Sequence, residues 1–163
     1  MEAKQPLLKV DDLHVSFFTP VGEVKAVNGI SYELDHGEVM GIVGESGSGK
    51  SVEAYSIMGL LQPPGRVVEG SITFDGQDVL AMNKKEKREF RGTQVSMIFQ
   101  NPMTCLNPVY TIGKQLSEAL LVHKKMKKEE ALAQVKEILT LVGINNVDER
   151  VNQYPHELSG GMR

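Results

Sequence analysis

Eight consecutive residues, Gly44 to Ser51, have the types and the spacing that would hold a chain of phosphates. They fit the pattern G-x-x-x-x-G-K-[ST], with Lys50 and Ser51 at its end. Glycines let the backbone approach an anion closely, so that successive N–H groups point at the phosphate oxygens. Lys50 would place a compact positive charge on the terminal phosphates, and the Ser51 hydroxyl would bind Mg²⁺. The residues expected to bind ATP in this stretch are Gly44, Glu45, Ser46, Gly47, Ser48, Gly49, Lys50, Ser51 and Val52.

The segments on either side of this loop should hold it in place. Val39–Val43 is a compact apolar run, which predicts a buried strand leading into the loop. A helix should follow to about Leu61, where Pro63, Pro64 and Gly65 would stop it. The positive end of that helix would face the phosphates. The spacing of the glycines does not match G-x-G-x-x-G, which disfavours a dinucleotide-binding loop.

Further strands and a short helix are expected in the first hundred residues. An apolar alternation over Leu8–Phe17 predicts a strand, and Pro20 begins a turn after it. Asn83 with Glu86 resembles a capping box, which predicts a charged helix ending near Gly92. The other predicted strands are Val24–Asn28, Ile30–Leu34, Val67–Phe74 and Val95–Phe99.

After Gln100 the apolar periodicity becomes helical. Thr111 is expected to cap one helix, and Gly143 to end a second one. The stripes that we expect to face the core are Ile112, Leu116, Ala119 and Leu120 in the first helix and Ala131, Leu132, Val135, Ile138, Leu139 and Val142 in the second.

Composition and charge exclude several classes of protein. The net charge of −3 argues against a nucleic-acid partner held mainly by bulk charge. A single cysteine, Cys105, rules out a disulfide framework within one chain and fits a reducing compartment; we expect its thiol to be buried. No apolar stretch approaches the length of a membrane span. A membrane role would therefore need another subunit to cross the bilayer.

Two later tracts resemble one family of nucleotide-binding proteins. Gln100 directly follows the predicted strand Val95–Phe99, and Leu158-Ser159-Gly160-Gly161 lies near the end of the sequence. With the loop at Gly44–Ser51, they resemble the ATPases of ABC transporters. The tracts Met97–Pro108 and Tyr154–Arg163 are similar to those of the oligopeptide and dipeptide importers. The resemblance implies an α/β fold with an antiparallel β subdomain, a P-loop core and an α-helical subdomain.

The resemblance also implies roles for individual residues. Phe17, with Phe18 as the next candidate, would stack on adenine, although one could belong to the core and the other to the surface. Gln100 would sense Mg²⁺ and the γ-phosphate. The segment from Leu158 to Gly161 would act in trans, on the ATP of a second ATPase subunit placed head to tail. The implied domains are residues 1–99, with the β subdomain and P-loop core, and residues 100–163, with the helical subdomain.

The resemblance further implies partners and a location. The Q-loop region, which is the tract Met97–Pro108 around Gln100, and the helical subdomain would contact transmembrane permease subunits at the cytoplasmic face of the membrane. An extracytoplasmic solute-binding protein would be an indirect partner. The expected function is ATP-driven uptake of dipeptides or oligopeptides. Alternatives that stay open are an importer for nickel or another small solute, a non-catalytic nucleotide-binding or assembly module, and a P-loop kinase, which the LSGG and Q-loop tracts argue against.

Within these 163 residues we find no counterpart of the family's Walker B strand, catalytic glutamate or switch histidine. The runs Ile72–Asp75 and Leu8–Asp12 come nearest, and neither has four apolar residues before the acid. Hydrolysis needs a group that orients the attacking water. We therefore expect these residues alone to bind nucleotide weakly and to hydrolyse almost none. We also expect them to self-associate through an unpaired sheet edge, and the tail to be mobile.

Overall fold

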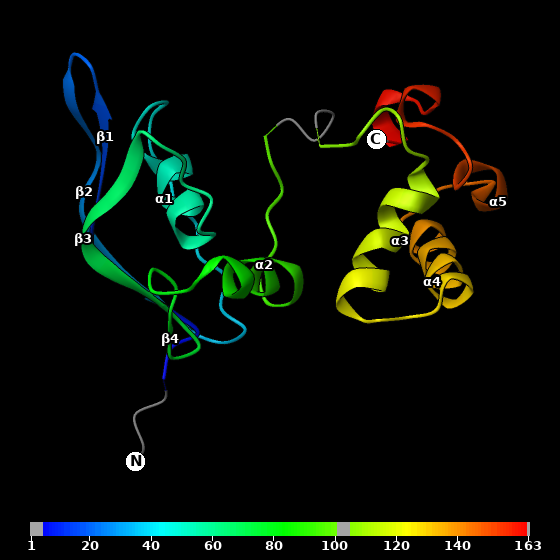
Figure 1. Cartoon of the computed structure of the whole chain (residues 1–163), viewed down its shortest axis with the longest axis horizontal. Coiled ribbons are helices and arrows are strands. Elements are labelled where there is room, and N and C mark those ends of the chain that lie inside the picture. Colours follow the sequence, from blue (N-terminus) through cyan, green and yellow to red (C-terminus); the bar gives the residue numbers. More distant parts are fainter. Residues whose placement is uncertain (1–4, 101–104, 163) are drawn as a thin grey trace. The chain divides into compact units, whose positions relative to one another are not determined.

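The computed structural model describes residues 5–100 and 105–162 and divides the chain into two compact units (Figure 1). The first unit runs to Arg91 and the second begins at Gly92, so the predicted boundary at residue 99 stays a prediction. Elements of the first unit are β1 (Leu8–Thr19), β2 (Gly22–Leu34), α1 (Lys50–Ile57), β3 (Gly65–Phe74), β4 (Gln77–Asp78) and α2 (Lys84–Thr93). Elements of the second are α3 (Ile112–His123), α4 (Lys128–Leu141), α5 (Val147–Arg150), η2 (Pro155–Glu157) and η3 (Gly160–Met162).

An antiparallel sheet of order β2-β1-β3-β4 forms most of the first unit. The apolar alternation of β1 is interrupted at Asp11–Asp12, where the register shifts and Asp12 has a φ of 46°. This bulge restores the phase of the alternation, so that Val10 and Leu13 are both buried. Gly70 lies opposite the bulge, where a Cβ atom would be 2.2 Å from the Asp12 carbonyl oxygen. The two short strands predicted in residues 24–34 are one continuous strand, β2.

Helices α1 and α2 complete the first unit. Phe90 of α2 is 2% exposed, and its ring meets Phe74 of β3 edge to face at 5.2 Å between centroids. The predicted capping box is confirmed: the Glu86 N–H donates to Asn83 Oδ1 (3.1 Å) and the Asn83 N–H donates to Glu86 Oε2 (2.7 Å). Arg91 Nη1 donates to the Met58 carbonyl oxygen at 3.1 Å, which satisfies a backbone group just past the end of α1.

Two predicted strands do not form. Val39–Val43 and Val95–Phe99 have no strand structure, and Val39, Val43 and Ile98 are more than nine-tenths exposed. A buried parallel strand requires hydrogen-bonding neighbours on both sides. Neither run joins the antiparallel sheet, and the four strands of that sheet are the only strands among the described residues. Apolar composition alone therefore gave a wrong prediction for these two segments.

The second unit is helical, and α3 packs against α4 (Figure 1). Thr111 caps α3, as predicted, by accepting from the Lys114 N–H at 3.4 Å. Gly143 ends α4 with a φ of 82°, also as predicted, and the Ile144 N–H donates to the Leu139 carbonyl oxygen. Helix α1 ends at Ile57, about one turn before the predicted end.

The predicted core stripes of α3 and α4 are partly wrong. Buried positions of α3 are Ile112, Gly113 and Ser117, and those of α4 are Ala131 and Val135. Leu116, Ala119, Ile138 and Val142 are exposed. An apolar stripe is buried only where a neighbouring element covers it, and the main contact of α3 is with α4. Cys105, which was expected to be buried, is also exposed.

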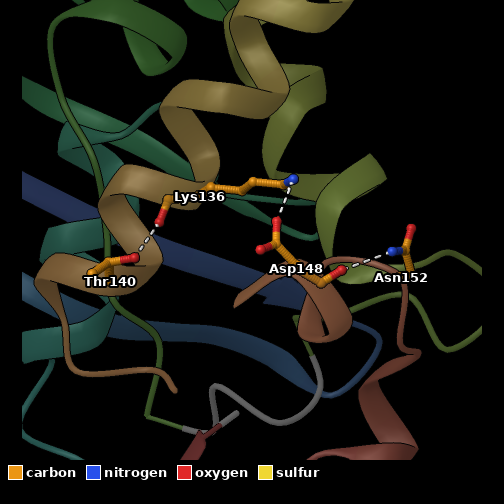
Figure 2. Close-up of polar contacts among 4 residues, drawn as sticks. All are labelled: Lys136, Thr140, Asp148 and Asn152. Atoms are coloured by element: carbon orange, nitrogen blue, oxygen red, sulfur yellow. Dashed lines mark hydrogen bonds and ion pairs between the residues drawn. The ribbon is translucent and has the colours of Figure 1, made fainter. Parts of the chain in front are cut away.

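Polar contacts hold α5 against α4 (Figure 2). Lys136 Nζ of α4 lies 2.6 Å from Asp148 Oδ1 of α5, and Asn152 Nδ2 donates to the Asp148 carbonyl oxygen at 2.9 Å. Thr140 Oγ1 donates to the Lys136 carbonyl oxygen one turn earlier. These contacts fix the start of the segment that leads to residues 155–162.

Among the helices of the described residues, none has the length and apolar character needed to cross a bilayer.

Candidate functional site: the phosphate-binding loop

Residues 44–49 form an exposed loop that leads directly into α1. Gly47 and Gly49 have φ values of 84° and 95°, in the region that favours glycine. Gly49 is the N-cap residue of α1, and its carbonyl oxygen accepts the first helical hydrogen bond, from the Glu53 N–H at 2.9 Å. The loop therefore ends where the unpaired N–H groups and the positive end of the helix are available to an anion.

Lys50 places its ammonium group inside this loop. Its Nζ donates to the carbonyl oxygens of Gly44 (2.6 Å) and Glu45 (2.7 Å) and to Ser48 Oγ (3.2 Å). These three oxygens hold the side chain curled over the loop rather than extended into solvent. The contacts join Lys50 to the first residues of the motif, so the loop and its lysine form a single local unit.

Strand β2 supports the loop from behind at two positions. A Cβ atom on Gly49 would lie 2.4 Å from the Ala26 carbonyl oxygen, so only glycine fits there. Tyr32 Oη donates to Glu53 Oε1 at 2.5 Å, and the Glu53 side chain is buried although it carries a carboxylate. Burial of the phenol, together with the hydrogen bond to this carboxylate, raises the pKa of Tyr32. The hydroxyl therefore stays protonated at neutral pH and remains a donor to Glu53.

Sequence reasoning missed this pair and the contact at Ala26. Tyr32 and Glu53 are 21 positions apart and lie on different elements, so no local pattern connects them. The only signal was an acidic residue, Glu53, in the first turn of an otherwise weakly polar helix. Such a residue is ordinarily explained by the helix dipole alone.

The two candidate aromatics of β1 have different surroundings. Phe17 is half-buried, and its ring lies so close to Gly65 that a Cβ atom there would be 2.7 Å from Phe17 Cε1. Phe18 is 38% exposed, and the Arg66 guanidinium lies over its ring, 4.0 Å from the centroid. A base that stacked on the face of Phe18 beneath Arg66 would have to displace the guanidinium, and the choice of Phe17 stays a prediction.

Gln100 and the segment Leu158–Gly161 belong to the second unit. Gln100 is exposed, and residues 101–104, in the tract that follows it, lie outside the described residues. Leu158 is 6% exposed, whereas Ser159, Gly160 and Gly161 are exposed. The Tyr154 N–H donates to Glu157 Oε2 at 2.7 Å, which fixes the turn just before Leu158.

Leu158 also borders a cavity of about 180 Å³ in the second unit. Its lining is almost entirely apolar and consists of Leu106, Ile112, Leu116, Leu139, Ile144, Arg150 and Leu158. We call Leu158–Gly161 the signature segment. It is anchored at its first residue, Leu158, and the three small residues after it present their backbone to solvent. A backbone displayed in this way can approach a ligand or a partner without obstruction by side chains.

Comparison with known proteins identifies the family of the chain. The family model described as "ABC transporter" matches residues 27–163. The chain is 54% identical over 160 residues to the dipeptide transport ATP-binding protein DppD of Bacillus subtilis, covering 98% of this chain and 48% of that protein. It is 49% identical over 165 residues to the oligopeptide transport ATP-binding protein OppD of Salmonella typhimurium, covering 99% and 49%. The chain thus spans about half the length of these relatives.

Solved structures with the same fold are ATP-binding cassettes. A dimeric structure of the cassette MJ0796, described as a post-hydrolysis state bound to ADP and Pi, aligns with a TM-score of 0.81 at 23% identity and covers 95% of this chain and 64% of that one. CbiO1 of Clostridium perfringens, part of the transporter complex CbiONQ, aligns with a TM-score of 0.71 at 26% identity, covering 96% and 57%. The predicted α/β fold is that of these cassettes. From the match over residues 27–163 and from these relatives, the chain belongs to the ABC transporter family.

Proposed function

We propose that this chain provides the ATP-binding site of a subunit that drives the import of dipeptides or oligopeptides. The observation that carries the proposal is the loop at Gly44–Ser51, closed by Lys50 and mounted on the positive end of α1. About half of the aligned residues are identical to those of dipeptide and oligopeptide transport ATP-binding proteins, which supports the choice of a peptide as the solute. In the whole protein, hydrolysis of ATP would be coupled to transport.

The residues of the loop also suit Mg²⁺ that arrives with ATP. Ser51 lies in the first turn of α1, is exposed, and offers a hard hydroxyl oxygen of the kind that Mg²⁺ prefers. When bound, Mg²⁺ would neutralise charge on the β- and γ-phosphates. Gln100 is the proposed second residue near the ion.

Assembly follows from the exposed signature segment. We propose a head-to-tail pair of ATPase subunits, in which the open backbone of Ser159–Gly161 meets the nucleotide held by the partner's loop. The dimeric form of the cassette MJ0796 supports pairing of such subunits. Permease subunits would contact the helical unit, and the complex would lie at the cytoplasmic face of the membrane. A solute-binding protein would deliver the peptide from outside.

Binding of MgATP by purified protein tests the proposal directly. Replacement of Lys50 by alanine should weaken the affinity about ten- to a hundredfold, because one charge-assisted contact to phosphate is lost. The matched control is Lys25→Ala, which removes an exposed lysine of β2 in the same unit and should leave the affinity unchanged. Equal affinities for the Lys50→Ala variant and the unaltered protein would contradict the proposal.

Uptake experiments distinguish peptide from nickel transport. Cells that lack this gene should lose uptake of a labelled dipeptide and keep uptake of nickel. Restoring the gene should restore peptide uptake, whereas the Lys50→Ala form should not. Loss of nickel uptake with normal dipeptide uptake would show that the site serves a different importer.

A further inference from the structure

We infer that the hydrogen bond between Tyr32 and Glu53 positions the first turn of α1 for nucleotide, so that both are positioning residues for the phosphate-binding loop. The inference rests on the proposed ATP-binding function and extends it to residues outside the loop motif. Neither residue needs to touch the nucleotide. They act through the turn that carries Lys50 and Ser51.

Glu53 ties that turn together through both its backbone and its side chain. Its N–H donates to the Gly49 carbonyl oxygen at 2.9 Å and closes the first hydrogen-bonded turn of the helix. Its carboxylate accepts from Tyr32 Oη at 2.5 Å on the neighbouring strand. Movement of the first turn away from the sheet would therefore break a charge-assisted bond in a buried place.

The pair does not work alone, because β2 contacts the same turn at a second place. Gly49 lies directly against the Ala26 carbonyl oxygen, with no room for a Cβ atom. Ala26 and Tyr32 are both in β2, so one strand holds the beginning of the turn by close approach and its end by a hydrogen bond. Two separated contacts restrict both translation and rotation of the turn, which a single contact cannot do.

Burial of the Glu53 carboxylate costs free energy, which its hydrogen bond to Tyr32 offsets. Glu53 is 5% exposed, and a carboxylate at such a position is tolerated only when it is hydrogen-bonded. An apolar side chain would fill the same space without that constraint. Placement of a directional bond here gives the turn one preferred orientation, which is what a preorganised phosphate site requires.

The test is nucleotide binding by the full chain, measured with MgATP at a temperature at which circular dichroism shows every variant to be folded. Tyr32→Phe removes only the donor and should weaken affinity about five- to tenfold. Glu53→Gln keeps an acceptor oxygen for Tyr32 and should stay within about twofold of the unaltered protein. The matched control is Tyr110→Phe, which removes a phenolic hydroxyl from an exposed residue of the second unit.

A local measurement separates positioning from general stability. In Tyr32→Phe, the amide hydrogen of Glu53, which donates to the Gly49 carbonyl oxygen, should exchange at least about threefold faster, whereas those of α4 should not change. Glu53→Leu removes the acceptor without leaving a buried charge and should lose affinity like Tyr32→Phe. It decides the question if Tyr32→Phe does not fold.

Each outcome has one meaning. If the unaltered protein binds MgATP and Lys50→Ala binds it more weakly, but Tyr32→Phe and Glu53→Leu both bind normally, the inference is overturned and the proposed function stands. If Tyr110→Phe loses as much affinity as Tyr32→Phe, the effect is not specific to the pair and the inference is equally overturned. If the unaltered protein binds no MgATP, the proposed function fails and the inference fails with it.

Discussion

The phosphate-binding loop and the signature segment are both rich in glycine, but they are held in opposite ways. In the loop, Lys50 bonds to the carbonyl oxygens of its own segment and Gly49 is pressed against β2. In the signature segment, Leu158 is buried while Gly160 and Gly161 have no atom within 4 Å of where a Cβ would be. The contacts that hold the first region lie within one unit, whereas the second region leaves the backbone of its glycines exposed. The difference shows that glycine can serve close internal packing in one place and free access in another.

The largest effect is expected at Gly49. Alanine there must adopt a φ of 95° and place its Cβ 2.4 Å from a carbonyl oxygen. Gly49→Ala should lower the free energy of unfolding by about 3 kcal/mol, measured by chemical denaturation. Gly47→Ala is the control, since it shares the positive φ but has nothing within 4 Å, and it should cost about 1 kcal/mol. Equal costs would mean that close approach to β2 is unimportant.

The next largest effect is expected at Leu158, the buried anchor of the signature segment. Leu158→Ala should cost about 2 kcal/mol of unfolding free energy, at the low end for such a change because an apolar cavity already borders the side chain. Thermal unfolding followed by circular dichroism measures it. Leu141→Ala, at an 86% exposed position, is the matched control and should have little effect. A neutral Leu158→Ala would show that the segment is not anchored there.

A smaller effect is expected from the turn that precedes the anchor. Glu157→Ala removes the acceptor for the Tyr154 N–H and should cost about 1 kcal/mol. Glu157→Gln keeps an acceptor oxygen and should recover most of that loss. The two variants are compared by denaturant titration. If the glutamine variant is as unstable as the alanine variant, the charge at residue 157 matters more than the hydrogen bond.

The smallest effect on stability is expected at Gly160. An added Cβ meets nothing within 4 Å and φ is not in the glycine region, so Gly160→Ala should change the free energy of unfolding by less than about 0.5 kcal/mol. ATP turnover of the assembled transporter should nevertheless fall, if this backbone faces the partner's nucleotide. Normal turnover in the Gly160→Ala transporter would remove the reason to treat this region as an interface.

Local patterns predicted much of the fold correctly. The Asn83–Glu86 box, the Thr111 cap and the Gly143 terminus are set by residues within a few positions of one another, and all three form as expected. The sequence of the loop likewise predicted its place at the start of α1. Interactions of this kind depend on neighbouring residues, which a sequence displays directly.

Apart from the early end of α1, the main failures are non-local. Val39–Val43 has the composition of a buried strand, but a strand also needs neighbours, which composition does not reveal. The burial of α3 and α4 depends on which turn of one helix meets the other, so Ile138 and Val142 were assigned to the core wrongly. The Tyr32–Glu53 contact joins a strand to a helix and leaves no trace in either local pattern.

The hydrogen bonds of Lys50 to its own loop affect how a phosphate can bind and leave. The Lys50 ammonium group already donates to three oxygens, so a phosphate that binds it would replace these hydrogen bonds and not add to them. Only the difference between old and new partners contributes to affinity, which keeps the gain from this residue moderate. When a bound phosphate leaves, the same three oxygens can accept from the ammonium group again. The loop would therefore exchange phosphate without leaving the Lys50 ammonium group unpaired at either stage.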